Sequence, residues 1–432
     1  MLKTDVLIIG GGLAGLSAAK ALEGRKSYIV AERESRPGGL ASTVSKGGFR
    51  FDYSGHLLHL RWPKTSKFIL DALGPNRLRL RRDARVYAHS RWTPFPFQAN
   101  LSGMPDKVKA ECVSGFLKAW NAGGGRGDGT EPFSRWTRRV FGEGISSHFM
   151  LPYNAKLWRY PLGRLTTEWC APFVPMPTPE EVVEGAYGRR TEGMGYNTSF
   201  YYPKRGGIGA LANALARGAS GLRLGLEVER VDLKKGVAQV RHFGPVHFKR
   251  LINTSPLNDF VAMAADAPAA VRRAAASLRH NSVYVLNLGA RGVRRDLHWA
   301  YFPGPEFPFY RAGIASNFSA ALAPRGCASF YVEFATAGEA LDLASAEKAA
   351  VKGLVACGLL DRASQVTERL WLRIPCAYVV YNRERAAALP VIDAWLKARR
   401  ARSIGRYGAW KYSFMEESVK EGLEAADALP RS

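Results

Sequence analysis

Apolar residues form a short continuous run near the N-terminus, Val6 to Ile9, with the length of a fully buried strand. This run leads directly into Gly10-Gly11-Gly12-Leu13-Ala14-Gly15, and an alanine- and leucine-rich helical segment follows. A second apolar run, Tyr28 to Ala31, ends at the acidic residue Glu32. The pattern predicts a strand, a glycine turn, a helix and a second strand, which together make a βαβ unit.

The glycines of this unit have the spacing of a dinucleotide-binding turn. Gly10 permits the tight turn, Gly12 lets a pyrophosphate approach the backbone, and Gly15 lets the helix lie close to the strand. Free N–H groups at the helix start favour a phosphate there. Glu32 stands where a carboxylate can accept both hydroxyls of an adenosine ribose. We therefore predict a dinucleotide site; a glycine-rich turn in another βαβ unit is the alternative.

Helical and strand patterns alternate along the rest of the chain. An amphipathic helical pattern from about 104 to 140 is interrupted by a glycine-rich stretch at 121–129. We interpret that stretch as a mobile surface connection, because no strand precedes it and no Gly-Lys-Ser/Thr follows. The later pattern predicts a helix that Gly218 terminates, several strands and a last helix, at 210–217, 222–231, 251–256, 283–289 and 417–426.

The net charge is strongly positive: 62 Lys and Arg stand against 37 Asp and Glu, which gives +25. Such a field attracts nucleotide diphosphates, anionic lipid or nucleic acid. The basic residues are scattered, with local concentrations at 77–85 and 397–406, and no nucleic-acid-binding motif accompanies them. We expect most of them to form a solvated surface and expect no nucleic-acid partner; weak contact with an anionic membrane surface is the minority alternative.

Cysteine usage and hydropathy bear on the compartment. The five cysteines show no CxxC or His-rich ligand spacing, which predicts a reducing compartment, no disulfide framework and no zinc site. Met1-Leu2-Lys3 and the apolar run after it mimic a signal peptide, but the glycine turn explains the same residues better. No run of about 18 apolar residues occurs, so we predict a cytoplasmic protein without a transmembrane segment.

Two further stretches suggest close contact with a ligand. An alternating segment, 47–59, breaks at Gly55, where a glycine suggests close backbone approach. It contains His56 and His59, but no third ligand lies at useful spacing, so we predict no metal. Alternating prolines and aromatics at 92–100 make a stiff surface on which a flat base could stack; a hydrophobic loop against the core is the alternative.

After Glu32 the chain continues with Arg33-Glu34-Ser35-Arg36-Pro37-Gly38-Gly39-Leu40. With the N-terminal motif, this string resembles the large FAD family that includes amine oxidases, protoporphyrinogen oxidase and UDP-galactopyranose mutase. The resemblance implies FAD as the cofactor, with the arginine and the paired glycines against the pyrophosphate and the flavin. The cofactor-binding residues that it implies are Gly10, Gly12, Leu13, Ala14, Gly15, Glu32, Arg33, Gly38, Gly39, Leu40, Val228, Gly405, Arg406, Tyr412, Ser413 and Met415.

Motifs in the same order as in the galactopyranose mutases extend the resemblance from Val6 to about Asp427, and the most specific is Pro152-Tyr153-Asn154-Ala155-Lys156-Leu157-Trp158. The resemblance implies that Gly55 and His56 touch the flavin ring and that Arg311 binds the substrate diphosphate, which makes these three the catalytic candidates. A histidine that caps a buried turn and an arginine stacked on surface aromatics are the alternatives. The implied substrate-binding residues are Phe95, Gln98, Asn154, Trp158, Phe173, Asn197, Tyr301, Arg311, Tyr378 and Tyr412.

The chain also departs from the mutase pattern. Mutases place a diphosphate-binding arginine about fifteen residues beyond the tryptophan, and Phe173 stands there instead. Phe95 and Phe318 stand where the mutases carry tyrosine. Losing a cation from a diphosphate site weakens binding, so the substrate need not be UDP-galactose.

The predicted fold class is α/β: an FAD-binding Rossmann-like domain with a helical domain and an antiparallel β-sheet substrate domain. Because 432 residues exceed what one core usually holds, two or three domains are expected. We assign 1–60, 195–265 and 395–432 to the FAD-binding domain, 100–165 to the helical domain, and 61–99, 166–194 and 266–394 to the substrate domain.

The resemblance predicts a flavin-dependent sugar-nucleotide mutase. In that reaction N5 of reduced FAD attacks the anomeric carbon, and the sugar ring opens and recloses between pyranose and furanose. The implied partners are a nucleotide-sugar substrate and an external electron donor, because no second βαβ fingerprint offers an NADPH domain. The alternative is an FAD-dependent oxidase or desaturase of the amine oxidase or protoporphyrinogen oxidase type, and a weaker one is a non-catalytic nucleotide-binding protein at an anionic surface.

Overall fold

The computed structural model describes residues 2–125, 127–189, 194–195, 198–293 and 295–430. The predicted βαβ unit is present as β1 (Leu2–Ile9), α1 (Leu13–Leu22) and β2 (Tyr28–Glu32), and the two strands pair in parallel. Val6, Leu7, Ile8 and Ile9 are all buried, as their continuous apolar run predicts. The mixed α/β class is therefore confirmed from the first elements of the chain onward.

The first sheet contains this unit and has the strand order β10-β11-β12-β1-β2-β9, with β18 paired to β12. β12 lies parallel to β1, whereas β10 and β11 form an antiparallel edge. The predicted single strand at 222–231 is wrong, because Gly225 adopts a φ of 68° and separates β9, paired to β2, from β10, paired to β11. The added strands are β9 (Leu222–Leu224), β10 (Val228–Asp232), β11 (Val237–Val240), β12 (Gly244–Asn253) and β18 (Ala401–Ser403).

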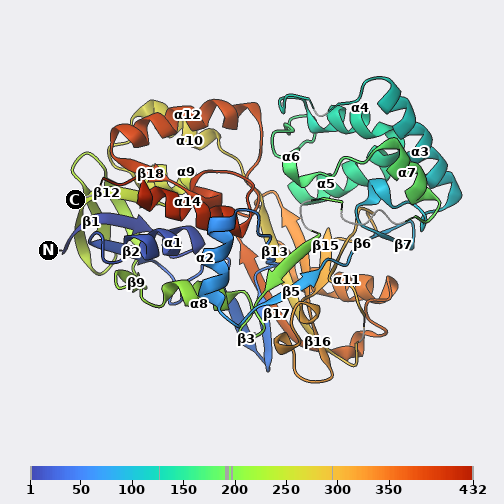
Figure 1. Cartoon of the computed structure of the whole chain (residues 1–432), viewed down its shortest axis with the longest axis horizontal. Helices are drawn as coiled ribbons and strands as arrows, with labels where there is room; N and C mark the ends of the chain where they lie inside the picture. Colours follow the sequence, from blue (N-terminus) through green and yellow to red (C-terminus); the bar gives the residue numbers. More distant parts are fainter. Residues whose placement is uncertain (1, 126, 190–193, 196–197, 294, 431–432) are drawn as a thin grey trace.

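Helices from distant parts of the chain pack around this sheet (Figure 1). α14 packs on α1, and Gly422 permits the contact because a Cβ there would lie 2.3 Å from the Ala14 carbonyl oxygen. The buried Glu416 of α14 accepts hydrogen bonds from Arg61 N at 2.6 Å and Trp62 N at 3.1 Å, and so caps α2. The helices of this part are α2 (Pro63–Leu73), α8 (Gly209–Ala216), α9 (Leu257–Met263), α10 (Ala269–Ser277), α12 (Arg383–Ala398), α13 (Gly405–Gly408) and α14 (Met415–Asp427).

The second sheet has the order β17-β13-β16-β15-β14-β6-β7, and it is antiparallel except for the β14–β6 pair. In β16 the residues Phe330, Val332 and Phe334 pack into the core under α11 (Leu343–Ala356), while Tyr331 belongs to the other core. Because successive side chains of a strand point to opposite faces, the polar Tyr331 lies on the face of β16 that is turned toward the first sheet. The strands are β6 (Ala84–Ala88), β7 (Arg91–Pro94), β13 (Ser282–Arg291), β14 (Trp299–Tyr301), β15 (Arg311–Ile314), β16 (Cys327–Thr336) and β17 (Val366–Ile374).

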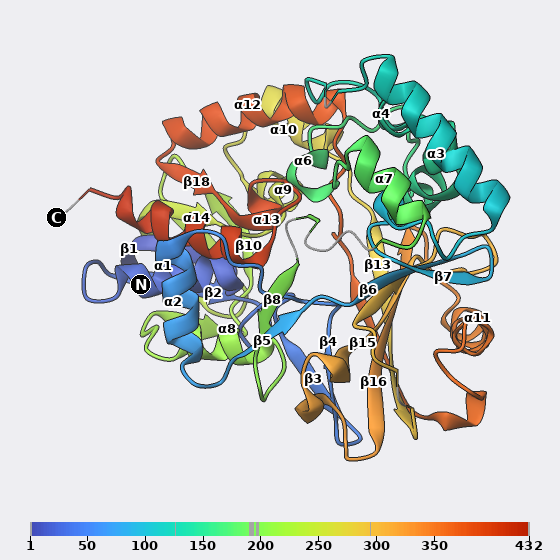
Figure 2. The ribbon, with the colours of Figure 1, turned by 45° about the vertical axis from the view of Figure 1, so that its right-hand side comes forward.

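A group of helices packs beyond β6 and β7, at the upper right of Figure 2. α3 and α4 pack closely because Gly142 and Gly144 of α4 face the α3 backbone, where a Cβ would lie 2.2 Å and 2.4 Å from main-chain atoms. The helices of this group are α3 (Asp106–Asn121), α4 (Phe133–Ile145), the π-helix Ser146–Met150, α5 (Leu151–Trp158), α6 (Cys170–Phe173) and α7 (Pro179–Ala186).

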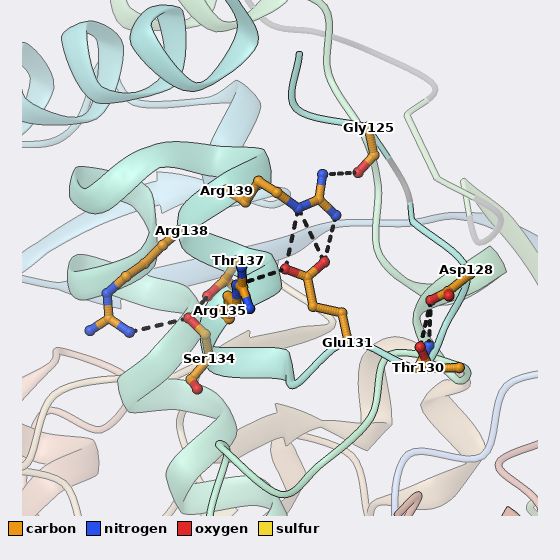
Figure 3. Close-up of polar contacts among 9 residues, drawn as sticks. All are labelled: Gly125, Asp128, Thr130, Glu131, Ser134, Arg135, Thr137, Arg138 and Arg139. Atoms are coloured by element: carbon orange, nitrogen blue, oxygen red, sulfur yellow. Dashed lines mark hydrogen bonds and ion pairs between the residues drawn. The ribbon is translucent and has the colours of Figure 1, made fainter. Parts of the chain in front are cut away.

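The glycine-rich connection between α3 and α4 is tied to α4 by arginines of that helix, chiefly Arg139 (Figure 3). Arg139 Nη1 donates to the Gly125 carbonyl at 2.9 Å, and its Nη2 donates to Glu131 at 2.6 Å. Asp128 accepts from the backbone N–H of Thr130 at 2.9 Å. These contacts hold the described part of the connection against the helix.

Two ribbons and several short 3-10 turns complete the fold. The ribbons are β3 (Thr43–Lys46) with β4 (Phe49–Asp52), and β5 (Leu78–Arg81) with β8 (Ser199–Tyr202). The turns are Phe97–Ala99, Ala315–Asn317, Ala320–Leu322 and Ala363–Gln365. Across the described ranges, no helix is both long enough and apolar enough to cross a membrane. The division into three domains stays a prediction.

Candidate functional site

A continuous cavity of about 870 Å³ opens at the C-terminal end of β1, and its walls come from both large sheets and from α5. It brings together residues from the whole length of the chain, including Gly10, Gln98, Asn154, Arg311 and Tyr412. Of the predicted site residues with a described position, only Gly15 and Trp158 do not line it. Asn197 lies outside the described residues.

One half of the cavity is built largely from backbone around the glycine turn. Glu32 accepts a hydrogen bond from Gly11 N at 2.6 Å with one carboxylate oxygen and from Glu34 N at 2.9 Å with the other. Gly12 is the N-cap of α1 and offers no side chain to cap it, so the first N–H groups of this helix are left for a ligand. This half suits the phosphates and ribose of a dinucleotide.

Gly15 has a different role from Gly10 and Gly12. A Cβ on Gly15 would lie 2.0 Å from the Gly10 carbonyl oxygen, so its hydrogen side chain permits the helix to pack on the turn. Gly38 approaches the same turn from the next loop and donates its N–H to the Gly11 carbonyl at 2.8 Å. The paired glycines therefore lie beside the phosphate end of the cavity, where Leu40 and Arg33 also line it.

The loop after β4 carries His56 at the middle of the cavity. The His56 Nδ1 lies 3.3 Å from the Ser54 carbonyl oxygen, which can only accept, so the ring proton sits on Nδ1. Burial lowers the pKa of His56 to about 4, and the ring is neutral near pH 7. Gly55 next to it faces Tyr331, whose hydroxyl would lie 2.5 Å from a Cβ there.

Arg311 differs from the expectation of a cation held ready for a diphosphate. Its Nε and Nη2 donate to the two carboxylate oxygens of Glu333 at 2.8 Å and 2.7 Å, and Nη2 also donates to Ser54 Oγ at 3.1 Å. The Glu333 side chain is 0% exposed. The pair is therefore a bidentate, buried ion pair whose net charge is zero.

Arg406 is a second, half-buried cation that lines the cavity. Its Nη1 donates to the Ser413 carbonyl at 2.8 Å and its Nη2 to the Ala377 carbonyl at 2.9 Å. The guanidinium carbon lies 5.3 Å from the ring centre of Tyr378 and 5.0 Å from that of Tyr412. The carbonyl and aromatic partners of Arg406 carry no net charge, so its positive charge is not neutralised. The charge of Arg311, in contrast, is balanced by Glu333.

Tyrosines cover much of the wall opposite the glycine turn. The Tyr153 ring packs edge-on against Tyr301 with centres 5.3 Å apart, and Tyr378 lies 5.6 Å from Tyr412. Burial raises the pKa of Tyr378 to about 12, so its hydroxyl stays protonated and can donate. The cavity-lining tyrosines are Tyr53, Tyr153, Tyr301, Tyr310, Tyr331, Tyr378, Tyr407 and Tyr412.

Five cavity-lining residues carry a polar side-chain atom without a hydrogen-bond partner among the described residues. These atoms are Gln98 Oε1, Trp169 Nε1, Trp299 Nε1, Tyr310 Oη and Ser413 Oγ, and all five residues are buried. The Gln98 amide is oriented by its Nε2, which donates to the Pro175 carbonyl at 2.7 Å. Buried polar atoms are rarely left unpaired, so these atoms indicate a polar ligand or water in the cavity.

Of the three phenylalanines that depart from the mutase pattern, Phe173 and Phe95 line the cavity and Phe318 does not. The Phe173 ring lies 4.4 Å from that of Tyr412, and the Phe95 ring lies 4.7 Å from that of Tyr301. The Arg82 guanidinium carbon is 5.2 Å from the Phe95 ring centre. Apolar surface therefore stands where the resemblance implies an arginine and a tyrosine hydroxyl.

The Asn154–Trp158 part of the motif is hydrogen-bonded within its own helix. Trp158 Nε1 donates to Asn154 Oδ1 at 3.1 Å, and Asn154 Nδ2 donates to the Met150 carbonyl at 2.8 Å. Trp158 lies behind Asn154 and not in the cavity wall, while Lys156 Nζ donates to the Phe302 carbonyl at 2.6 Å. The motif thus fixes α5 against the second sheet more than it presents free polar groups.

Sequence reasoning missed several residues of the site. Glu333 was detectable as a lone acid in the apolar strand Phe330-Tyr331-Val332-Glu333-Phe334, since a buried carboxylate requires a partner. Tyr331 and Tyr310 had no such signal, because alternation alone does not tell which face of a strand lines a cavity. Ser54 was visible only as the residue before Gly55.

A family model for an NAD(P)-binding Rossmann-like domain matches residues 8–70. Two curated proteins align with short segments of the chain: a neurosporene-forming phytoene desaturase of Rhodobacter capsulatus, 52% identical over 48 residues, and a human all-trans-retinol 13,14-reductase, 35% identical over 78 residues. These segments make up 11% and 18% of this chain and span only 9% and 13% of the relatives. The chain therefore matches only a small part of the length of these curated relatives.

Solved structures match nearly the whole chain. A reduced UDP-galactopyranose mutase is 26% identical with a TM-score of 0.92, covering 98% of this chain and 95% of that one. A candidate protoporphyrinogen oxidase from Exiguobacterium sp. 255-15 gives 14% and 0.73, and a putrescine oxidase bound to putrescine gives 16% and 0.69, each covering 99% of this chain and 98% of the other. The chain therefore has the fold of this reduced UDP-galactopyranose mutase over nearly its whole length, and the two oxidases share that fold less closely.

Proposed function

We propose that this chain is an FAD-dependent enzyme that interconverts the pyranose and furanose forms of a nucleotide-linked sugar. The observation that carries the proposal is the TM-score of 0.92 with a reduced UDP-galactopyranose mutase over 98% of the chain. The oxidases reach 0.73 and 0.69 over the same length. The similarity therefore includes the second sheet and the helices that form the substrate half of the cavity.

The residues around the glycine turn fit FAD. The uncapped start of α1 would hold the pyrophosphate, Glu32 would hold the ribose, and Val228 lines the same end of the cavity. When bound in its reduced form, FAD would supply the nucleophilic N5 for the anomeric carbon. Gly55 and His56 would lie at its ring, with the neutral His56 ring presenting Nε2 as an acceptor.

The substrate half offers hydroxyl and amide groups suited to a sugar and its phosphates. Tyr301, Tyr378 and Tyr412 can donate to phosphate oxygens, and Gln98 Oε1 and Trp169 Nε1 are left to pair with a polar ligand. Arg406 would place a positive charge beside the departing phosphate. A nucleotide sugar as substrate and an external electron donor as partner are parts of this proposal.

The test is incubation of dithionite-reduced, FAD-loaded protein with UDP-galactofuranose, followed by chromatography. Appearance of the pyranose form, dependent on reduction and on FAD, supports the mutase reaction. Absence of interconversion for a panel of UDP- and dTDP-linked sugars, with protein that binds FAD fully, contradicts it.

A second candidate is an FAD-dependent oxidase or desaturase. Phe173 and Phe95 make the wall more apolar, and the neutral Arg311–Glu333 pair offers no net charge to a diphosphate. Such an enzyme would accept hydride on FAD, which an anaerobic substrate panel of amines and apolar alkenes would reveal by bleaching of the flavin. Bleaching without sugar isomerisation favours this candidate.

A further inference from the structure

The loop after β4 is held against the second sheet at consecutive residues. The Ser54 side chain reaches Arg311 of β15 and Glu333 of β16, and Gly55 packs against Tyr331 of β16. The Ser54 backbone carbonyl lies 3.3 Å from His56 Nδ1. One serine thus contacts the buried ion pair with its side chain and the cavity histidine with its backbone.

The hydrogen bonds of Ser54 define the direction of its hydroxyl. Oγ donates to Glu333 Oε1, because a carboxylate can only accept, and it accepts from Arg311 Nη2 at 3.1 Å. Both interactions are charge-assisted, which makes them stronger and shorter than those between neutral groups. The hydroxyl is therefore a third member of the buried Arg311–Glu333 pair.

We infer that Ser54 is a positioning residue that couples the Gly55–His56 loop to the Arg311–Glu333 pair. The inference rests on the proposed function, in which the loop lies at the flavin ring and Arg311 faces the substrate. Through Ser54, the position of Arg311 and the position of the loop are fixed relative to each other. Ligand contacts at Arg311 and hydrogen bonding at the flavin ring then depend on one another.

Removing the hydroxyl leaves the fold in place. In Ser54→Ala the bidentate bonds between Arg311 and Glu333 remain, so neither buried charge loses its partner. The loop, however, loses its side-chain tie to the pair. Ser54→Thr keeps a hydroxyl, and the partial exposure of Ser54 leaves room for the added methyl group.

The matched control is Ser282→Ala. Ser282 is 3% exposed on β13 of the same sheet, its Oγ donates to the Pro375 carbonyl at 2.6 Å, and it does not line the cavity. This variant removes one buried serine hydrogen bond without touching the loop. The Ser282 variant therefore shows the effect of losing a serine hydrogen bond in this sheet away from the loop.

The experiment measures the midpoint potential of bound FAD, the dissociation constant of UDP and the thermal midpoint of the four proteins. We expect Ser54→Ala to shift the potential and to weaken UDP binding about tenfold. Ser54→Thr returns both toward the wild-type values, and Ser282→Ala changes only the thermal midpoint.

The inference is overturned when Ser54→Ala and Ser282→Ala give the same potential and the same UDP affinity. If the wild-type protein binds FAD but not UDP, the inference is tested by the midpoint potential of bound FAD alone. If the wild-type protein takes up no FAD, both the proposed function and the inference are wrong. If the FAD-loaded protein is an active mutase but its midpoint potential is the same in the wild type and in Ser54→Ala, the inference is wrong and the proposed function stands.

Discussion

The two halves of the cavity are built in different ways. The dinucleotide half is built mainly from the backbone N–H groups and glycines of one continuous segment, Gly10 to Glu32, with Gly38, Leu40 and Val228 beside it. The substrate half consists largely of side chains from α5, β14, β15, β16 and α13 and from the loops before α12 and α14. A backbone site tolerates little change in its glycines, whereas a side-chain site can keep its shape while its charges change. Phe173, which stands in the second half where the resemblance implies an arginine, would be such a change.

The largest expected effect comes from separating the buried ion pair of the substrate half. Glu333→Ala leaves the Arg311 guanidinium buried without its carboxylate, and we expect a loss of about 3–5 kcal/mol in the free energy of unfolding. Urea denaturation measures it. The control is Glu347→Ala, which removes a partly exposed partner of Arg369 and should cost about 1 kcal/mol or less. Equal losses in the two variants would contradict a special role for the buried pair.

The next effect tests the dinucleotide half. Glu32→Gln weakens the hydrogen bonds that the carboxylate accepts from Gly11 N and would weaken those to a ribose, so the FAD dissociation constant should rise about tenfold to a hundredfold. Flavin fluorescence titration measures it. Glu34→Gln is the control, because that side chain is 61% exposed and its ion pair with Arg33 spans 3.4 Å. An unchanged affinity in Glu32→Gln places the ribose elsewhere.

A pH effect follows from His59, which lines the cavity beside the ribbon of β5 and β8. Burial lowers its pKa from 6.5 to about 4, so the unfolded chain binds the extra proton first as the pH falls. The stability contribution of His59 is complete above pH 6.5 and is lost as the pH falls toward 4. Between about pH 7.5 and about pH 5 this amounts to roughly 2 kcal/mol.

The measurement compares urea denaturation of wild-type protein and His59→Leu at both pH values. The variant should lose about 2 kcal/mol less on acidification. Asp52 has the opposite slope, since burial raises its pKa to about 6, but it is present in both proteins and cancels in the difference. Identical pH slopes in the two proteins would show that His59 is not buried as a neutral ring.

The smallest expected effect restores a charge to the substrate half. Phe173→Arg places a guanidinium beside Tyr412, and we expect UDP to bind about tenfold more tightly through charge-assisted hydrogen bonds. Isothermal titration measures the affinity, with Phe173→Leu as the control for lost aromatic packing. If both variants bind UDP equally, a diphosphate does not reach this part of the wall.

The sequence predicts the dinucleotide half of the cavity better than the substrate half, for a physical reason. Strand, glycine turn, helix and acid are contiguous, so their spacing alone determines the local geometry of Gly10, Gly12 and Glu32. The break at Gly225 was missed because the apolar pattern continues across it, and only the positive φ shows that β9 and β10 pair with different strands.

The substrate half depends on pairings across long sequence separations. Arg311 could be named as a site residue from its motif, but its bond to Glu333 depends on the register of β15 with β16. The contact of Tyr331 with Gly55 depends in turn on how the loop after β4 packs on β16. The length and polarity of strands predict that they exist, but not which side chains meet across them.

The central claim is that FAD lies along the turn of β1 and α1, with its ring at the Gly55–His56 loop and facing a polar cavity. The most direct measurement is a crystal structure of the FAD-reconstituted, reduced protein soaked with UDP. The account predicts the adenosine ribose at Glu32, the flavin ring at His56 and the UDP phosphates among Tyr301, Tyr378 and Tyr412. Protein that remains colourless after reconstitution, or UDP bound away from these tyrosines, would contradict it.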